Sequence, residues 1–286
     1  MSVRFTAAAV QMNAGPEVAD NLPVAGDLIR RARDAGAELI SLPEVAVSVT
    51  TGRAETFKRA RPAHEHPAIP FFRDLARETG AILHVGSLTV KLPDEERVAN
   101  RTYVFTPADG IVATYDKIHM FDVDLDGGES YRESNSFRPG DEAVVVDTRW
   151  CRLGLSICYD VRFAYLYRAL AHAGAKVVMI PAAFTVPTGT AHWHTLVRAR
   201  AIETGCYVIA AAQTGTHAQG RKTFGHSLIV DPWGEVLADA GTEPGVITAE
   251  IDLDRVEAVR GKVPSLTHDR RFKGPADTVR LGAVGE

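Results

Sequence analysis

Short apolar runs recur along almost the whole chain, each four to seven residues long and most of them followed by polar or turn-forming residues. Such runs are typical of buried β-strands, and segments with helical periodicity separate several of them. The alternation of the two patterns predicts an α/β fold. The strand-like runs lie at residues 5–11, 39–42, 82–86, 102–105, 111–115, 144–147, 153–157, 177–181, 207–212, 226–230 and 246–251, and the helical segments at 18–35, 68–79, 163–173 and 191–204.

Two turn signals within this pattern predict antiparallel hairpins, and therefore mixed sheets. The sequence Thr-Pro-Ala-Asp-Gly at 106–110 joins two neighbouring strand-like runs, and Asp-Pro-Trp-Gly at 231–234 follows another. Proline and glycine in such short connections favour tight turns. No linker, repeat or low-complexity tract interrupts the chain before its end. We therefore expect one catalytic domain over residues 1–272 and a peripheral tail over residues 273–286.

Composition limits the partners that the chain can have. Its 286 residues are 45% hydrophobic, enough for a large core, and 32 Lys and Arg stand against 36 Asp and Glu. This balance argues against a nucleic-acid partner or a membrane surface, and no apolar run reaches membrane-spanning length. The N-terminus lacks the pattern of a signal peptide. Cys151, Cys158 and Cys206 form no closely spaced pair, so we expect a reducing, cytoplasmic setting.

Three reactive side chains each lie where an apolar run breaks into a polar turn. They are Glu44 in Leu-Pro-Glu, Lys117 in Tyr-Asp-Lys-Ile-His and Cys158 in Ile-Cys-Tyr-Asp. Taken singly, each has an ordinary explanation as a loop carboxylate, a surface lysine or a buried cysteine. Taken together they supply what thiol-based amide hydrolysis requires, since a carboxylate moves protons, a thiol attacks carbon and a cation stabilises the oxyanion.

These motifs, in this order, resemble the Glu-Lys-Cys motifs of the nitrilase superfamily of carbon–nitrogen hydrolases. The resemblance extends over most of the chain and includes Gly-Leu-Ser-Ile-Cys-Tyr-Asp-Val-Arg-Phe around Cys158. It implies a four-layer αββα sandwich with two mixed β-sheets and at least a homodimer. It also implies Cys158 as nucleophile, Lys117 as oxyanion cation and Glu44 as general base. We expect partial desolvation to raise the pKa of Glu44 toward the working range of such a base.

The same resemblance assigns two supporting residues. Glu133 lies in a polar, glycine-containing loop after Lys117, where the superfamily has a second, structural glutamate. We assign Glu133 to positioning Lys117 and the substrate, and Glu129 is the lower-ranked candidate for this role. Tyr159 follows the nucleophile at a predicted strand-to-helix turn, where its backbone N–H group is expected to face the oxyanion.

The stretch at 188–203 resembles the Nit branch of the superfamily, the small amidases that act on ω-amides and deaminated glutathione. It contains His192, His194 and Arg198, which we expect near the substrate. Eukaryotic members usually have Ala-His-Trp-Glu in this stretch, so His194 departs from the pattern, and the difference would alter specificity if this position touches the substrate.

A simpler interpretation of this stretch is a helix N-terminus. Thr188 or Thr190 would then cap the helix, and the histidines would only pack against their neighbours. Because His192 and His194 have no third ligand at metal spacing, we expect no metal site and no cofactor.

The resemblance implies an amidase that forms a Cys158 thioester, with deaminated glutathione as the expected substrate and 2-oxoglutarate and cysteinylglycine as products. Alternatives within the enzyme class are an ω-amidase acting on 2-oxoglutaramate, a nitrilase or an N-carbamoyl-amine hydrolase. An alternative from another class is a non-catalytic scaffold protein. The intact set of Glu44, Lys117 and Cys158 argues against a scaffold, which has no need of all three.

Overall fold

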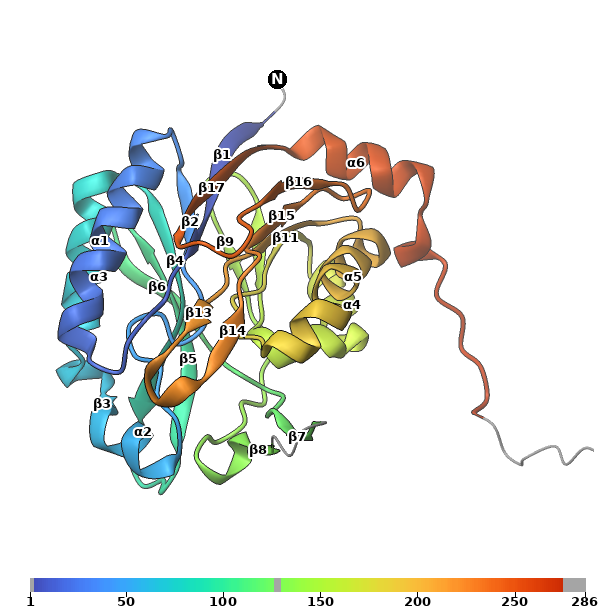
Figure 1. Ribbon diagram of the computed structural model, residues 1–286. Helices are drawn as coiled ribbons and strands as arrows, with labels where there is room; N and C mark the ends of the chain where they lie inside the picture. The colour runs from blue at the N-terminus through green and yellow to red at the C-terminus, as the bar shows by residue number, and fades with distance from the viewer. Residues whose placement is uncertain (1–2, 126–129, 275–286) are drawn as a thin grey trace, which may run out of the picture.

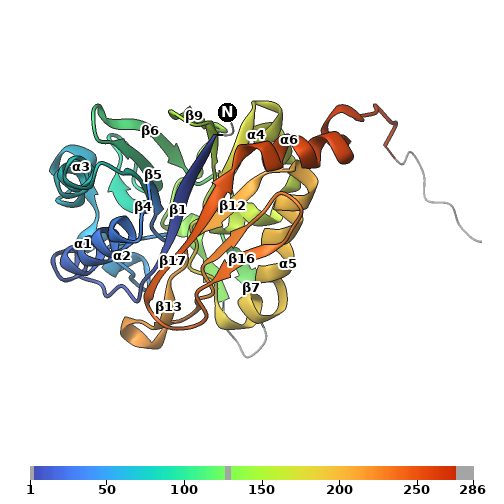
Figure 2. The same ribbon diagram turned by 90° about the horizontal axis from the view of Figure 1, so that it is seen from above.

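Two mixed β-sheets lie face to face with helices on their outer sides in the computed structural model, which describes residues 3–125 and 130–274 (Figures 1 and 2). The strand order in the first sheet is β17 (Gly245–Asp252), β1 (Arg4–Gln11), β2 (Leu39–Ser41), β4 (Ile82–Lys91), β5 (Val98–Thr106) and β6 (Gly110–Asp116), with β3 (Arg61–Pro62) beside β4. The order in the second sheet is β16 (Val236–Asp239), β15 (Leu228–Val230), β12 (Tyr207–Ala210), β11 (Ala175–Met179), β10 (Arg152–Leu155) and β9 (Val145–Asp147).

Helices cover the outer face of each sheet. Helices α1 (Val18–Asp34) and α3 (Ala68–Thr79) pack on the first sheet, and α4 (Ala164–His172) and α5 (Val186–Thr204) pack on the second (Figure 2). The remaining elements are α2 (Arg53–Arg59), α6 (Leu253–Lys262) and two small ribbons, β7 (Asp122–Asp124) with β8 (Ser130–Arg132) and β13 (Thr214–Thr216) with β14 (Lys222–Phe224). The predicted αββα sandwich is therefore confirmed.

Strand β1 shows how the sequence pattern produces these layers. Successive side chains of a strand point to opposite faces of its sheet. Phe5, Ala7 and Ala9 belong to the core that lies between the two sheets and under α4 and α5. Ala8 and Val10 belong to the core under α1 and α3. Because both faces of the strand are buried, it is apolar along most of its length instead of alternating with polar residues.

The two expected hairpins are present as antiparallel pairs, β5 with β6 and β15 with β16. The helix expected at 191–204 begins earlier, at Val186, and follows Thr185 as its N-cap residue. Pro187 lies in its first turn, where the fixed φ of proline suits a helix. The expectation that Thr188 or Thr190 caps this helix is therefore wrong, since both lie inside it.

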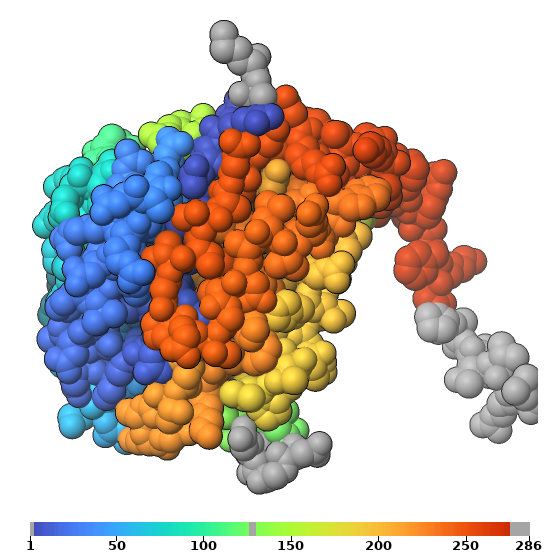
Figure 3. All heavy atoms as spheres, turned by 45° about the horizontal axis from the view of Figure 1, so that its top comes forward, coloured from blue at the N-terminus to red at the C-terminus, as the bar shows by residue number. Residues whose placement is uncertain are grey.

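After α6, residues 265–269 still contact α4 and α5, and the chain then leaves the body of the molecule (Figures 1 and 3). Most of the predicted tail, residues 275–286, lies outside the described residues. Within the described ranges, no helix has the combination of length and apolar character that crossing a bilayer requires.

Candidate active site

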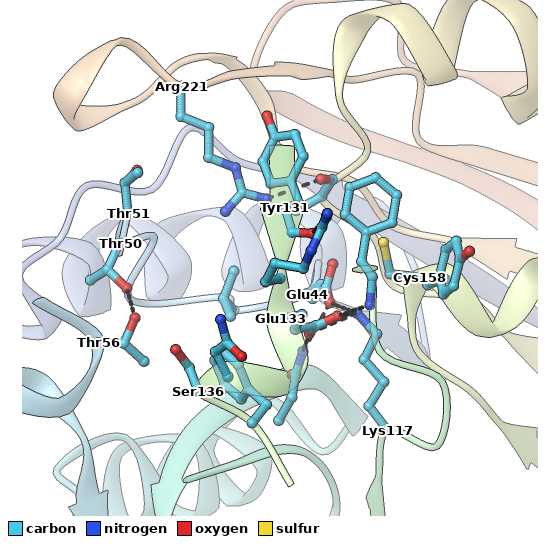
Figure 4. Close-up of a pocket in the computed structure, with 18 of the residues that line it drawn as sticks. Glu44, Thr50, Thr51, Thr56, Lys117, Tyr131, Glu133, Ser136, Cys158 and Arg221 are labelled. Atoms are coloured by element: carbon cyan, nitrogen blue, oxygen red, sulfur yellow. Dashed lines mark hydrogen bonds and ion pairs between the residues drawn. The ribbon is translucent and has the colours of Figure 1, made fainter. Parts of the chain in front are cut away.

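One pocket is lined by reactive side chains from both sheets. Glu44 and Lys117 follow β2 and β6 of the first sheet, and Cys158 follows β10 of the second. Figure 4 shows their side chains converging with that of Glu133. The pocket has a volume of about 440 Å³, enough for a small organic molecule. The structure thus brings together the three residues that the motifs singled out, although they lie far apart along the chain.

Lys117 is a buried cation held between two carboxylates. Its side chain is 2% exposed, and its Nζ lies 2.8 Å from Glu44 Oε1 and 2.9 Å from both carboxylate oxygens of Glu133. Burial alone would lower the pKa of Lys117, but the charges of Glu133 and Glu44 raise it well above its usual value. Lys117 therefore carries a full positive charge at neutral pH.

Glu44 is nearly as buried, and its position is held from several directions. Its Oε1 also accepts a hydrogen bond from Asn100 Nδ2 at 2.9 Å. Its backbone oxygen accepts one from Gln213 Nε2 at 3.2 Å. The next residue, Val45, has a φ of 45°, and its N–H group donates to Ser87 Oγ at 2.7 Å. A β-branched residue in this left-handed region is strained, so its neighbours must hold the turn after Glu44 in place.

The expected pKa shift of Glu44 is wrong in sign. Burial does raise the pKa of Glu44, as expected from the sequence. The charge and hydrogen bond of Lys117, together with the Cys158 thiol as a further partner, outweigh that effect and hold the pKa below its ordinary value. The sequence predicts the desolvation of Glu44 but not its ion pair with Lys117, because the two residues lie 73 positions apart along the chain. Glu44 is therefore ionised at neutral pH and can accept a proton.

Cys158 lies at the turn after β10 with a φ of 49°, and its N–H group donates to Pro181 O at 2.8 Å. Burial raises the pKa of its thiol, and the Glu44 carboxylate raises it further, well above the usual value. The resting pair is therefore a neutral thiol beside an ionised carboxylate. This arrangement suits a nucleophile that loses its proton to the adjacent base only as it attacks.

Asp160 ties the turn of Cys158 to the strand end of Lys117. Its buried carboxylate accepts hydrogen bonds from Tyr115 Oη at 2.7 Å and Ile157 N at 2.9 Å. Its other oxygen accepts from His119 N at 3.0 Å. These contacts connect the end of β6 in the first sheet to the end of β10 in the second. The distance between the ammonium and the thiol is thereby constrained by hydrogen bonds as well as by packing.

The two supporting residues assigned with the catalytic motifs lie in the pocket. Glu133 contacts Lys117 and also accepts a hydrogen bond from Phe121 N at 2.7 Å. Tyr159 lines the pocket, with its ring edge-on to those of Phe121 and Phe163. Glu129, the competing candidate for the role of Glu133, lies outside the described residues.

The three residues expected near the substrate on α5 lie elsewhere. None of them is among the described residues that line the pocket. His192 contacts Arg162 at 3.3 Å, His194 contacts Asp239, and Arg198 donates to Gly234 O at 2.8 Å. Helix α5 reaches the pocket only with its first turn, through Thr188, because its later turns run along the outside of the second sheet.

Two pocket residues carried no signal in the sequence. Asn100 lies near the start of β5, where it resembles any polar residue of a strand. Arg221 lies in the connection between β13 and β14 and extends toward the pocket (Figure 4). Its Nη2 donates to Ala183 O at 3.3 Å, and its Nε is buried without a hydrogen-bond partner among the described residues. Both residues gain importance only when distant segments meet.

Comparison with known proteins agrees with this geometry. The family model of carbon–nitrogen hydrolases matches residues 6–261. The deaminated glutathione amidase of Synechocystis is 42% identical over 269 residues, which are 92% of this chain and 97% of the relative. The crystal structure of the NitFhit protein of Caenorhabditis elegans superposes with a TM-score of 0.87 at 38% identity. That match covers 93% of this chain and 65% of the longer NitFhit chain.

A solved structure of an amidase variant from Nesterenkonia contains acrylamide added to the active-site cysteine. It superposes with a TM-score of 0.76 at 26% identity, over 91% of this chain and 98% of the other. The cysteine of that relative therefore reacts with an electrophilic carbon.

Proposed function

Because the chain belongs to the carbon–nitrogen hydrolase family, we propose that it is a thiol-dependent amidase that hydrolyses deaminated glutathione through a thioester on Cys158. The observation that carries the proposal is the meeting of a neutral thiol, an ionised carboxylate and a buried ammonium in one pocket. A scaffold protein would have no use for this arrangement, since two charged groups buried without function are costly to maintain.

Acylation begins when the Cys158 thiol loses its proton to Glu44 and its sulfur attacks the amide carbonyl carbon. The carbonyl oxygen becomes an oxyanion, which the Lys117 ammonium and the backbone N–H group of Tyr159 stabilise. Glu44 then returns the proton to the amide nitrogen as the C–N bond breaks. The amine leaves, and the acyl group remains on sulfur as a thioester.

Deacylation uses the same groups with water in place of the thiol. Glu44 takes a proton from water, whose oxygen attacks the thioester carbon. The second oxyanion collapses as the C–S bond breaks, and the proton returns to the sulfur. Throughout, Glu133 keeps Lys117 in position, since it contacts the ammonium through both of its carboxylate oxygens.

Deaminated glutathione joins a 2-oxoglutarate-like acyl part to a cysteinylglycine leaving group, so it has a carboxylate at each end. Such a substrate needs cationic donors on both sides of the reacting carbonyl. Arg221 supplies one, and its buried Nε, which has no hydrogen-bond partner in the described part of the chain, supports a role in binding an anion. Arg53 and Arg132 line the same pocket, although Arg132 already pairs with Asp124 at 2.8 Å. The relative in Synechocystis supports the same substrate.

The test compares kcat/KM for deaminated glutathione and for 2-oxoglutaramate, which has the same acyl part but releases only ammonia. We expect a clear preference for deaminated glutathione. Arg221→Met should lower kcat/KM by about 10- to 100-fold, since hydrogen bonds to charged groups contribute about 1.5–3 kcal/mol. Lys222→Met is the matched control, because Lys222 is an exposed neighbour that does not line the pocket among the described residues.

The possible results test the assigned substrate and the thioester mechanism separately. A preference for the small amide would overturn the assignment of deaminated glutathione and leave the thioester intact. Turnover by Cys158→Ala would overturn the thioester mechanism itself. Cys151→Ala should retain activity, since Cys151 lies away from the pocket lining.

The proposal includes a cytoplasmic setting and a homodimer. Cys151, Cys158 and Cys206 are all free in the structure, which suits a reducing compartment that keeps a thiol nucleophile available. The homodimer follows from the family and is tested below.

A further inference from the structure

Three potential metal ligands meet on the outer side of the second sheet, away from the pocket. They are His194 in α5, His226 just before β15 and Asp239 at the end of β16. One ligand atom from each lies within 4.8 Å of the others. None of the three is among the described residues that line the active-site pocket. The catalytic proposal therefore gives this cluster no role.

Asp239 is the centre of the cluster. Its Oδ2 lies 2.9 Å from His194 Nε2, and its Oδ1 lies 2.9 Å from His226 Nδ1. The side chain of His194 is 39% exposed, that of His226 is 25% exposed and that of Asp239 is 32% exposed, so solvent reaches the cluster. A bound ion could therefore complete its coordination with water.

Backbone hydrogen bonds and a ring contact fix the position of His226, although part of its side chain is exposed. Its backbone has a φ of 53°, which is unusual for a residue other than glycine. Its carbonyl oxygen accepts a hydrogen bond from Trp193 Nε1 at 2.7 Å, and its N–H group donates to Gly241 O at 2.7 Å. Its ring stacks on Phe224 with 4.5 Å between centroids. Such supporting contacts orient a metal ligand before the metal arrives.

Asp239 is oriented in the same manner. Its Oδ1 accepts a hydrogen bond from Gly241 N at 2.9 Å, and this bond fixes the carboxylate relative to the turn after β16. His194 lies on the adjacent face of α5, with its ring edge-on to that of His226 at 5.1 Å. All three ligands therefore come from different elements whose relative positions the fold already determines.

We infer that His194, His226 and Asp239 form a zinc site with water in the remaining position. Two imidazoles and a carboxylate suit Zn²⁺, which binds His nitrogen and carboxylate oxygen and accepts three protein ligands plus water. Mg²⁺ and Ca²⁺ prefer oxygen ligands throughout and should bind poorly here. The expectation of no metal site considered only His192 and His194. It missed this cluster because Asp239 lies 45 residues from His194 and 13 from His226.

Zinc bound here would join α5 to the β15–β16 hairpin. Helix α5 also supplies Thr188 to the wall of the pocket through its first turn. Because an ion that binds only the folded state stabilises that state, Zn²⁺ should raise the melting temperature. The turnover rate should not depend on the ion, since no ligand of the cluster is among the described residues that line the pocket.

The experiment uses untagged full-length protein with Cys158→Ala, so that zinc cannot bind to the pocket thiol. Titration of ZnCl₂ in a calorimeter should show one equivalent bound, and Zn²⁺ should raise the melting temperature while Mg²⁺ does not. His194→Ala and Asp239→Asn should each weaken binding by about tenfold or more, since even residues that only orient ligands contribute about 10- to 100-fold. His192→Ala is the matched control, because it removes an exposed histidine of the same helix outside the cluster.

Two results would overturn the inference. One is the absence of one-equivalent binding in the parent protein. The other is equal zinc binding by the Cys158→Ala protein and by its His194→Ala and Asp239→Asn derivatives, which would place any bound zinc elsewhere. Folding of each variant is checked by its melting temperature in the presence of a chelator. Neither result bears on the amidase proposal, which is tested separately by the turnover of wild-type protein with and without chelator.

Discussion

At the scale of single residues, Asn100 shows how the carboxylates around Lys117 are held. Its Nδ2 donates to Glu44 Oε1 at 2.9 Å and reaches Glu133 Oε1 at 3.4 Å. Its Oδ1 is buried without a partner in the described part of the chain. A strand residue that contacts both carboxylates and keeps a free acceptor beside the pocket is placed to orient Glu44 and to bind a water molecule or an amide N–H group.

Asn100→Leu should lower kcat/KM by about 10- to 100-fold, since a hydrogen bond to a charged group contributes about 1.5–3 kcal/mol. The lost donor stabilised the ionised form of Glu44, so its pKa should rise. The acidic limb of the pH–rate profile should therefore move to higher pH. Asn135→Leu is the control, because Asn135 lines the same pocket without a side-chain bond to these carboxylates among the described residues. An unchanged acidic limb in Asn100→Leu would exclude this role.

Lys117→Met should destabilise the fold as well as abolish activity. It leaves Glu44 and Glu133 buried without their cation, and breaking a buried pair costs about 3–5 kcal/mol. Urea denaturation at pH 7 measures the loss. A loss of activity without any loss of stability would contradict the view that the carboxylates depend on Lys117.

The loss of stability in Lys117→Met should depend on pH. In the wild type the folded pKa of Glu44 is depressed, so its contribution is present above the unfolded pKa of about 4.3 and is lost as the pH falls through the folded value. In the variant, burial raises the folded pKa above the unfolded one, so stability falls as the pH rises past about 4.3. The difference between the two proteins should therefore be largest near neutral pH and shrink in acid.

At the scale of secondary-structure elements, the site depends on strand β4 passing closely between two loops. A Cβ atom on Gly86 would lie 2.1 Å from Leu42 O, 2.4 Å from Pro181 Cβ and 2.5 Å from Pro43 O. The first loop continues into Glu44, and Pro181 O accepts the hydrogen bond from Cys158 N. The carboxylate and the thiol approach each other because glycine occupies this position between the sheets.

Gly86→Ala should destabilise the protein by about 1–3 kcal/mol or more, as overpacked sites do, and should reduce kcat by separating Glu44 from Cys158. Thermal denaturation and kcat are measured together. Gly261→Ala in α6 is the control, since a Cβ atom there meets nothing within 4 Å. That change should stabilise the helix by about 0.5–1 kcal/mol and leave kcat unchanged. Wild-type stability in Gly86→Ala would show that the loops can move apart freely.

At the scale of the whole molecule, several large apolar side chains lie exposed on the side of the second sheet and on the segment after α6. Tyr165 in α4 is 67% exposed, Trp233 is 52% exposed and Phe272 is 89% exposed. A second copy of the chain that packed over these side chains would remove their apolar surface from water. These side chains suit the homodimer that the family resemblance implies.

Light scattering at micromolar concentration should give at least twice the chain mass of 30.9 kDa. Replacement of Tyr165 and Trp233 by aspartate should lower the measured mass, because buried charges destabilise an apolar interface. The matched control places aspartate at Lys91, an exposed residue at the end of β4 in the first sheet. A strictly monomeric wild type would contradict the proposed assembly.

The sequence by itself determined the layers of this protein and the identity of its reactive groups. Apolar runs that bury both faces of strands, as in β1, and helical stripes such as α1 and α3 are local patterns, so they predict elements and their stacking. The motifs around Glu44, Lys117 and Cys158 are also local. Each can be recognised without knowing where the others lie.

Only the tertiary structure decided the charge states and contacts of these groups. The pKa of Glu44 depends on Lys117, 73 residues away, so the shift expected from the sequence has the wrong sign. For the same reason, the sequence did not reveal that Arg221 and Asn100 line the pocket, or that His194 lies outside it and contacts Asp239. Electrostatic and hydrogen-bond energies depend on distances of a few ångströms between segments, and those distances exist only once the two sheets have packed together.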